Sequence, residues 1–346
     1  MNTAGPTHEP LVRRWGRRSL TLPAYAFAAA AMLLLAPLLF PLAAGIDLAR
    51  RRGWVLVRCL AMVDVFLAAE VAGVVGATAT WLRGPRSGPV FLERNFRLQC
   101  WWANTLFRAG EQLFALRVRV EGDAKAARGP VLIFVRHVSP VDNLIPAVLL
   151  SDRHGLRLRW VLNRWLLRDP CLDIVGNRLA NAFVRGGTDS DAHPAARGPL
   201  GPAPAINGRA PLSPPGALVT PARRERALSR LGGSPWLPRA EALTTVLPPR
   251  MGGALALLEA APAADVVVCA HRGFEPAGSY RAFLSGAFIG SEIAIAFWRF
   301  PREGIPGSRD ERTAWLYDRW AEVDRWVSAA GGETPTAVST PVHTGV

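Results

Sequence analysis

The stretch FVRHVSPVDN, residues 134–143, decides the fold of this chain, because an apolar run ends in it and a helix start follows. The run PVLIFV, residues 130–135, is continuous, apolar and partly β-branched, which predicts a short buried strand. Ser139 and the proline after it predict a helix start, since serine is a good N-cap and proline fits the first helical position. His137 therefore lies at the mouth of a strand, with Asp142 in the first turn of the next helix.

His137 and Asp142 admit two interpretations. They can be a general base and its orienting acid, because imidazole titrates near neutrality and a carboxylate fixes its tautomer and stabilises the imidazolium. The spacing from Ser139 to Asp142 is also close to that of a capping box, in which the acid reaches back to the N-cap amide and no catalysis is needed. The spacing alone leaves both interpretations open.

Composition and charge limit the classes to which the chain can belong. Its 346 residues correspond to about two domains, 50% of them are hydrophobic, and the net charge is +14. Lys125 is the only lysine, so arginine carries a positive charge that attracts anionic lipid headgroups or nucleic acid. The arginines lie in membrane flanks and strands without a recognisable binding module, so no nucleic-acid partner is expected.

The cysteines are scattered, without the spacing of a metal site or a redox motif: Cys59, Cys100, Cys171 and Cys269. We interpret them as buried thiols in a reducing compartment. The sequence indicates neither a metal site nor a glycine-rich nucleotide loop, so no bound cofactor and no metal are expected.

The N-terminal region is expected to lie in a membrane. A basic tail, residues 1–19, precedes the almost uncharged residues 20–48, a stretch longer than the ~20 residues that cross a hydrocarbon core. A second apolar stretch, residues 54–82, contains two acids and an arginine, and each charge at mid-membrane costs roughly 2.5–3.5 kcal/mol. Residues 20–86 are therefore expected to form a membrane-embedded helical hairpin with both ends in the cytoplasm. A helical pair within one leaflet fits the sequence equally well.

Residues 94–116 mix tryptophan and phenylalanine with arginines. This pattern is typical of an interfacial helix with aromatic residues at headgroup depth. It fits an ordinary amphipathic helix packed on a protein core equally well.

After residue 115 the pattern changes to alternating strands and helices. Strands are expected at 116–122, 130–135, 156–162, 182–186, 264–271 and 292–300, and helices at 141–150 and 311–329. This alternation predicts an α/β domain over residues 90–329, a mixed sheet flanked by helices and preceded by the N-terminal hydrophobic hairpin. Residues 330–346 have little apolar content and are expected to be a disordered tail.

A segment rich in Pro, Ala and Gly, at about residues 188–219, interrupts this domain. A structureless loop of this length is uncommon inside a compact domain. It is interpreted either as a disordered insertion or as the product of a shifted reading frame or rearrangement, since GC-rich DNA read out of frame gives such a composition.

The first motif resembles that of the glycerolipid acyltransferase family, which includes 1-acylglycerol-3-phosphate and other lysophospholipid acyltransferases. That motif is a His, four residues and an Asp, commonly with a Ser two residues after the His. His137, Ser139 and Asp142 match it. The resemblance covers roughly residues 90–330, and it implies the family's α/β fold.

Two later stretches extend the resemblance. Residues 158–187 look like the approach to the family's second motif, which ends here in Phe183, Val184 and Arg185. Residues 246–271 look like the segment of the fourth motif and are similar to the lysocardiolipin acyltransferase subgroup. The ordered set of motifs is more specific than any one of them.

The third motif, FPEGTR in the family, is where the chain departs. The only candidate is SPPGAL, residues 213–218, which keeps a Pro and Gly216 but has Pro215 in place of the acid and Leu218 in place of the arginine. In the family this motif is thought to bind the acceptor's phosphate, and a lost cation removes a charge-assisted hydrogen bond of roughly 1.5–3 kcal/mol. Three arginines just downstream could substitute: Arg223, Arg224 and Arg226.

The resemblance implies a mechanism. His137 is implied to take the proton from an acceptor hydroxyl as that oxygen attacks an acyl thioester, while Asp142 orients the ring. The residues implied to bind substrate are Ser139, Arg185 and Gly216. His271, at the end of a predicted strand, is interpreted as a structural histidine rather than a second base.

The resemblance further implies a membrane-bound acyltransferase that acylates a lysophospholipid, in phospholipid synthesis or remodelling. Acyl-CoA or acyl-carrier protein is the implied co-substrate, membrane lipids are the implied partners, and the implied location is a bacterial-type inner or plasma membrane with the active site facing the cytoplasm. The alternative is a catalytically impaired lipid-binding membrane protein of the same fold, which the altered third motif favours.

Overall fold

A mixed seven-stranded sheet forms the centre of the computed structural model, which describes residues 9–51, 53–179, 181–184, 205–207, 220–278 and 280–329. The strands are β1 (Arg117–Glu121), β2 (Val131–Val135), β3 (Leu158–Asn163), β4 (Ala182–Val184), β5 (Ala205–Asn207), β6 (Asp265–Arg272) and β7 (Glu292–Phe300). Their order is β1-β7-β6-β2-β5-β3-β4, and all neighbours are parallel except β6 and β7.

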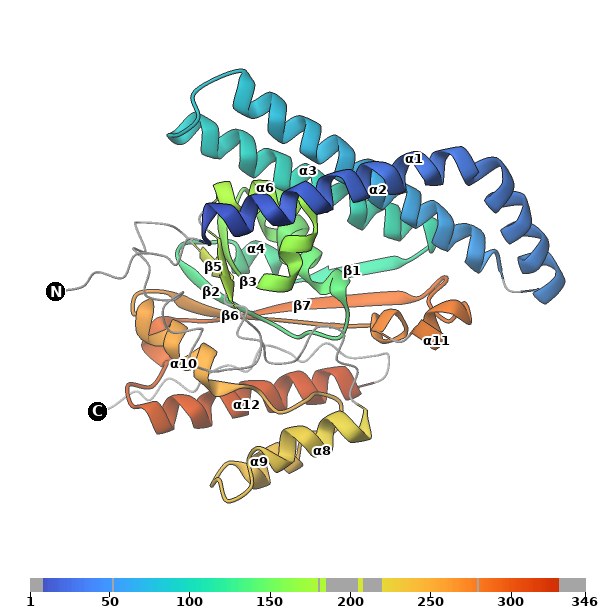
Figure 1. The fold of residues 1–346 in the computed structure, drawn as a ribbon. Coiled ribbons are helices and arrows are strands. Elements are labelled where there is room, and N and C mark those ends of the chain that lie inside the picture. The colour runs from blue at the N-terminus through green and yellow to red at the C-terminus, as the bar shows by residue number, and fades with distance from the viewer. Residues whose placement is uncertain are drawn as a thin grey trace, which may run out of the picture.

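Helices cover both faces of this sheet (Figure 1). One layer contains α1 (Leu11–Arg50), α2 (Val55–Leu82), α3 (Pro89–Leu113) and α6 (Pro170–Arg178). The opposite layer contains α8 (Pro221–Ser229), α9 (Leu237–Glu241), α10 (Met251–Ala260) and α12 (Arg309–Ser328). Shorter elements are α4 (Asp123–Ala126), α5 (Leu144–Pro146), α11 (Tyr280–Leu284), and the 3-10 turns η3 (Arg164–Arg168), η5 (Glu275–Gly278) and η6 (Arg302–Gly304). The predicted α/β fold with an N-terminal helical hairpin is confirmed.

Strand β2 shows why the central strands are continuous apolar runs. Ile133 and Val135 pack in the core on the side of α3, whereas Leu132 and Phe134 pack in the core on the side of α10 and α12. Successive side chains of a strand point to opposite faces, so a strand covered on both faces buries every residue.

The helical segment after β2 is less regular than the helix predicted over residues 141–150. A 3-10 turn, η1 (Pro140–Asn143), is followed by α5 and then by a π-helical stretch, η2 (Ala147–Asp152). Pro146 explains the irregularity, because it offers no N–H to the carbonyl of residue 142 and its ring crowds the preceding turn. The segment nevertheless fills the core, since Ile145 and Leu150 are fully buried.

Helix α1 begins at Leu11, so residues 11–19 of the predicted basic tail belong to the helix. Arg17 and Arg18 explain this earlier start, because each lies 2.8 Å from a carboxylate oxygen of Asp173 and thereby holds this end of α1 on α6. The helix is visibly bent (Figure 1), which its three internal prolines explain.

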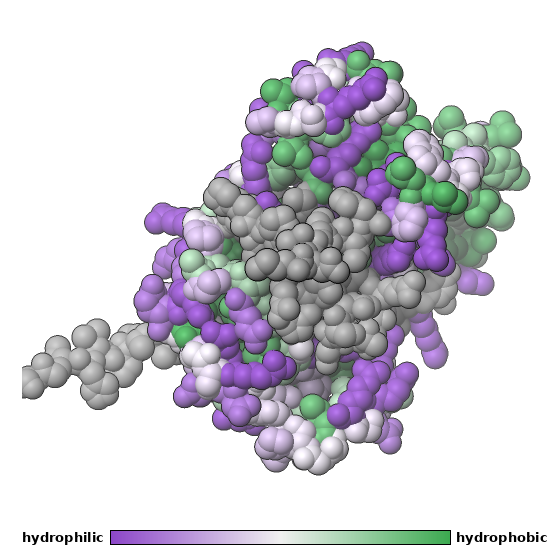
Figure 2. Space-filling view, turned by 60° about the vertical axis from the view of Figure 1, so that its left-hand side comes forward, coloured by the Kyte–Doolittle hydropathy of each residue, from purple (hydrophilic) through white to green (hydrophobic). Residues whose placement is uncertain are grey.

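The outer surface of the hairpin is apolar. Among the described residues, α1 is the one helix long and apolar enough to cross a membrane, and it is barely buried. Large exposed apolar side chains gather on α1, α2 and α3, for example Leu34 (79% exposed) and Phe27 (75%). The others in the described part of the chain are Trp54, just before α2, and Trp165. Figure 2 shows apolar residues gathered on this side of the molecule.

Helix α3 packs as a core helix. Ala103 and Phe107 belong to the core between the sheet and the hairpin layer, and Trp102 donates a hydrogen bond to Glu70 of α2. The amphipathic interpretation of residues 94–116 is therefore confirmed. Trp101 is 43% exposed, and contact of this helix with a membrane interface stays a prediction.

Several predictions fall on residues outside the described ones: the tail at 330–346, Arg185, Gly216 and the candidate third motif at 213–218. Of the Pro/Ala/Gly-rich segment, the structure describes only Ala205–Asn207. These three residues form β5, which pairs with both β2 and β3.

Candidate active site

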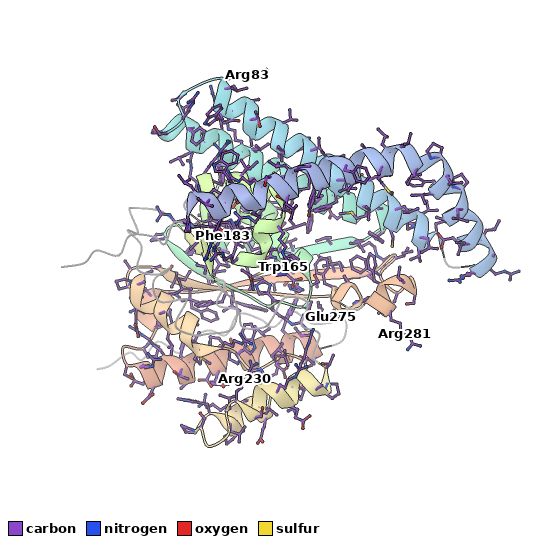
Figure 3. The ribbon with its side chains drawn as sticks, in the orientation of Figure 1. Arg83, Trp165, Phe183, Arg230, Glu275 and Arg281 are labelled. Carbon is purple, nitrogen blue, oxygen red and sulfur yellow. The ribbon has the colours of Figure 1, made fainter. Side chains whose placement is uncertain are left out.

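The carboxyl ends of β2, β3 and β6 meet at one edge of the sheet, because these strands run parallel. His137 follows β2, Arg164 and Trp165 follow β3, and His271 lies near the end of β6. Figure 3 labels Trp165 and Glu275, which follow β3 and β6. In open α/β sheets the ligand site lies outside the carboxyl ends of the strands, so this edge is the candidate site.

The loop after β2 places the predicted base and acid in the protein interior. His137 is 6% exposed and Asp142 is fully buried. His137 Nδ1 lies 3.6 Å from Asp142 Oδ2, within ion-pair range but longer than a hydrogen bond. Catalytic contacts of this kind commonly tighten in the transition-state complex. The structure thus brings the two residues together.

The carboxylate of Asp142 is held by the chain that precedes it. Its Oδ2 accepts hydrogen bonds from the amides of Val138 at 2.5 Å and Ser139 at 2.7 Å. Its Oδ1 accepts a hydrogen bond from the Ser139 hydroxyl at 2.7 Å. These donors fix both oxygens, so the acid has one orientation relative to His137.

The structure contains half of a capping box. The acid accepts from the amide of Ser139, as a capping box requires. The Ser139 hydroxyl, however, donates to the Asp142 carboxylate, and the Asp142 amide reaches the Ser139 carbonyl at 3.4 Å. The same Oδ2 that accepts the cap amide also faces His137, so the two interpretations of this stretch are not exclusive.

The electrostatics keep Asp142 ionised. Burial by itself raises the pKa of Asp142, but its contacts with His271 and His137 outweigh burial and hold that pKa at about 2. Burial lowers the pKa of His271, because it disfavours the imidazolium more than the nearby carboxylate favours it. At neutral pH Asp142 is therefore a carboxylate and His271 is neutral.

Arg136, His271 and Glu275 are residues of this site that the sequence patterns did not assign to it. The Arg136 guanidinium donates to the His271 carbonyl at 2.7 Å and to Glu275 Oε1 at 2.9 Å. His271 Nε2 lies 3.4 Å from Asp142 Oδ1. The pairing of β2 with β6 brings these residues together. The available signal in the sequence was a histidine at the end of a buried strand, with an acid shortly after the strand.

Of the residues expected to bind substrate, the structure describes Ser139, while Arg185 and Gly216 lie outside the described residues. Ser139 is 2% exposed and its hydroxyl is engaged with Asp142, and its contact with a substrate stays a prediction. Phe183 of the second motif packs on Gly176, where an added Cβ would come within 2.9 Å of the Phe183 ring.

Two of the three arginines downstream of the third motif bind backbone carbonyls. Arg224 donates to the carbonyls of Glu241 and Leu243, and Arg226 donates to that of Ala222. In Figure 3 the labelled Arg230, just after α8, lies below the sheet, on the side opposite the hairpin.

A metal site is not indicated by the part of the chain that the structure describes, since no group of three or more His, Cys, Asp or Glu side chains there could hold an ion. Whether the protein works without a bound cofactor stays a prediction.

Comparisons with known proteins add a similarity of fold. No protein-family model matches the sequence, and no curated protein matches it. Among solved structures, the 1-acyl-sn-glycerophosphate (LPA) acyltransferase PlsC from Thermotoga maritima is similar, with a TM-score of 0.49 and 11% sequence identity. The match covers 80% of this chain and 100% of that chain.

Proposed function

We propose that the protein is a membrane-bound O-acyltransferase, which moves a fatty acyl group from an acyl thioester to the free hydroxyl of a lysophospholipid, with a lysophosphatidic acid-like acceptor. The observation that carries the proposal is the buried His137–Asp142 pair at the carboxyl edge of the sheet. The apolar surface of the hairpin supports a lipid substrate. The resemblance of the ordered motifs supports the type of reaction.

His137 acts as the general base. Its Nδ1 faces Asp142, so Nε2, on the other side of the ring, is the nitrogen that takes the acceptor's proton. As that O–H bond breaks, the oxygen forms a bond to the carbonyl carbon of the thioester. The Asp142 carboxylate stabilises the imidazolium that results, and general-base catalysis of this kind contributes about 10²- to 10⁴-fold.

The tetrahedral intermediate then collapses with cleavage of the carbon–sulfur bond. The thiolate leaves and takes the proton from the His137 imidazolium. The products are the new ester and the free thiol, and His137 is neutral again for the next cycle. Acyl-CoA or acyl-carrier protein supplies the thioester, and either is consumed as a co-substrate.

Helix α1 binds the membrane in this proposal. Its 40 residues extend ~60 Å, about twice the hydrocarbon thickness of a bilayer. Its first turns are held on α6 by the contacts of Arg17 and Arg18 with Asp173. Both features favour a helix that lies along one leaflet of an inner or plasma membrane, with the site facing the cytoplasm where acyl thioesters are available.

A second candidate is a lipid-binding membrane protein of the same fold that has lost turnover. The observation that favours it is the third motif, where Pro215 and Leu218 replace the acid and the arginine of the family pattern. In that case the His137–Asp142 pair is retained as a helix cap.

The test is acyl transfer by the full-length protein in detergent micelles or isolated membranes. Labelled acyl-CoA, or labelled acyl-carrier protein, is offered with a panel of lysophospholipids, and diacyl product is measured. We expect product with at least one acceptor, and we expect His137→Ala to reduce it by about 10²- to 10⁴-fold.

His154→Ala is the matched control, since His154 also pairs with a carboxylate, that of Asp123 at 2.9 Å, but lies after the helical segment rather than at the site. Its turnover should remain that of the wild type. Absence of product with every acceptor and both donors would contradict the proposal and support the second candidate.

A further inference from the structure

Asp142 is contacted by two histidines, one at each carboxylate oxygen. His137 Nδ1 lies 3.6 Å from Oδ2, and His271 Nε2 lies 3.4 Å from Oδ1. His271 is fully buried on β6 and cannot itself meet a substrate. Because it contacts Asp142, any effect of His271 on the reaction must act through that acid.

The hydrogen bonds of His271 define its protonation state. Its Nε2 lies 2.7 Å from the carbonyl oxygen of Arg136, and a carbonyl only accepts, so Nε2 carries a proton. Its Nδ1 is buried and has no hydrogen-bond partner among the described residues, which suits a lone pair better than an N–H group. His271 is thus a neutral ring whose single N–H is shared between the Arg136 carbonyl and Asp142 Oδ1.

Arg136, which directly follows β2, also contacts β6. Its amide donates to the Cys269 carbonyl at 2.9 Å, and its guanidinium donates to the His271 carbonyl at 2.7 Å. The residue before His137 is therefore tied to β6 on both its backbone and its side chain. The N–H of His271 adds the link from this segment to the acid.

We propose that His271 is a positioning residue, whose N–H bridges the backbone carbonyl of Arg136 and the carboxylate of Asp142 and so sets the spacing between His137 and its acid. The kinetic part of this inference rests on the proposed acyl transfer. Without the bridge, the Arg136 carbonyl oxygen, with its partial negative charge, and the Asp142 carboxylate lose their common donor and repel each other. Asp142 keeps the amides of Val138 and Ser139, so the segment that carries His137 is the one that moves.

The neutral state of His271 matters for the same reason. An imidazolium at this position would neutralise Asp142, whereas a neutral donor leaves the carboxylate charge for His137. The other ionisable groups that face the site from neighbouring elements are Arg136, Glu275 and Cys269. Arg136 and Glu275 pair with each other at 2.9 Å, and burial keeps the Cys269 thiol protonated by raising its pKa.

The test uses full-length protein labelled with ¹⁵N-histidine in detergent micelles. Its six histidines are assigned by single substitutions, and their tautomers and titration midpoints are measured by NMR. The variants are His271→Phe, which removes the donor, and His271→Gln, which restores an N–H near Nε2. His154→Gln is the matched control at a histidine–carboxylate pair away from the site.

We expect wild-type His271 to be neutral at pH 7, with its proton on Nε2. In His271→Phe the titration midpoint of His137 should move to lower pH, because its acid is farther away. In the same variant kcat should fall by about 10- to 100-fold with little change in KM, the cost of a misplacement of about 1 Å. His271→Gln and His154→Gln should resemble the wild type in both measurements.

The inference is overturned if His271→Phe is folded and leaves the His137 midpoint unchanged. It is overturned equally if wild-type His271 carries its proton on Nδ1, a measurement that needs no variant to fold. If the wild type transfers no acyl group, the proposed function fails, whereas the NMR midpoints still decide the positioning role.

Discussion

Asp142 and Glu70 are both buried carboxyl groups, 0% and 1% exposed, yet their pKa values lie on opposite sides of neutrality, at about 2 and about 9. Asp142 lies at the carboxyl edge of the sheet, and Glu70 lies on α2, where the hairpin packs on the globular part. The same loss of water around a carboxyl group therefore leads to an ion at one place and to a neutral acid at the other.

The neighbours of each carboxyl group explain the difference. Asp142 is surrounded by amides, a hydroxyl and two histidines, all of which favour the ion. Burial raises the pKa of Glu70, and the neighbouring Asp169 raises it further, although Trp102 and the Cys171 amide donate hydrogen bonds to it. Burial strengthens the effect of neighbouring groups on the pKa of a carboxyl group. The charges and hydrogen-bond donors of those neighbours decide whether that pKa rises or falls.

The comparison also separates two functions of buried acids. Asp142 stays ionised and can stabilise the imidazolium that forms at His137. Glu70 and Asp169 are a pair of acids at the N-terminus of α6, and the pKa of Asp169 is raised as well because it too is buried. At neutral pH Glu70 keeps its proton, so the pair links α2 to α6 without placing two negative charges side by side.

Replacing each acid by its amide should give the largest contrast. Asp142→Asn removes the charge that supports His137, so kcat should fall by about 10²- to 10⁴-fold. Glu70→Gln imitates the uncharged acid, and its single oxygen can accept from either the Trp102 N–H or the Cys171 amide, which bind different oxygens of Glu70. Because Glu70 lies away from the carboxyl edge of the sheet, turnover should stay close to that of the wild type. Acyl transfer by the two purified variants is the measurement, and an equal loss in both would remove the distinction.

The second-largest effect is expected in how the free energy of unfolding depends on pH through Glu70. The folded pKa of Glu70, about 9, lies above its ordinary value of 4.5, so the folded state keeps a proton that the unfolded state loses as the pH rises. This stability is fully present below pH 4.5 and is lost as the pH rises towards about 9, by up to about 1.4 kcal/mol per pH unit.

Glu70→Gln should abolish this loss, so that its free energy of unfolding exceeds that of the wild type at pH 8 and changes less between pH 6 and 8. Denaturant unfolding in micelles at several pH values provides the measurement. Glu259→Gln, on the exposed face of α10, is the control and should keep the wild-type slope. A Glu70→Gln slope equal to the wild-type slope would show that Glu70 is ionised in the fold.

Ser139→Ala should have a smaller effect. It removes a hydroxyl that donates to the Asp142 carboxylate, and the free energy of unfolding should fall by roughly 1–3 kcal/mol. Ser151→Ala is the control, because Ser151 is buried in the same helical segment and its hydroxyl has no hydrogen-bond partner among the described residues. If Ser139 holds Asp142, kcat falls; if it binds the acceptor, KM rises instead.

The smallest effect is expected at the start of α1. Arg18→Gln removes one of the two guanidinium groups on Asp173, a partly buried ion pair, and should cost about 1 kcal/mol or less. Hydrogen exchange should then become faster in the first turns of α1, while α3 stays unchanged. Unchanged exchange in α1 would mean that Arg17 alone holds this end.

The parts that could be predicted from the sequence are those that local patterns specify. Strand β2 and the His137–Asp142 spacing lie within a dozen consecutive residues, and burial on both faces makes the strand a continuous apolar run. The irregular helix after β2 was harder to predict, because apolar periodicity indicates a helix without showing how Pro146 distorts it.

The parts that could not be predicted depend on distant pairing. His271 reaches Asp142 only because β6 lies beside β2, and no local pattern shows which strands are neighbours. Glu70 is one of the two acids by which the sequence predicts a weaker membrane span at 54–82, whereas in the structure it is buried against Asp169 and α6. A buried acid in an apolar helix can meet lipid or another acid, and only the packing distinguishes the two.

The pH dependence of kcat/KM, compared between the wild type and Asp142→Asn, tests most directly the claim that His137 is a general base supported by Asp142. The acid limb of the wild-type profile should have its midpoint at the titration midpoint of His137 measured by NMR. In Asp142→Asn both midpoints should move together to lower pH, since the imidazolium has lost its carboxylate. A rate midpoint that does not follow His137, or that stays unchanged in Asp142→Asn, would contradict the account.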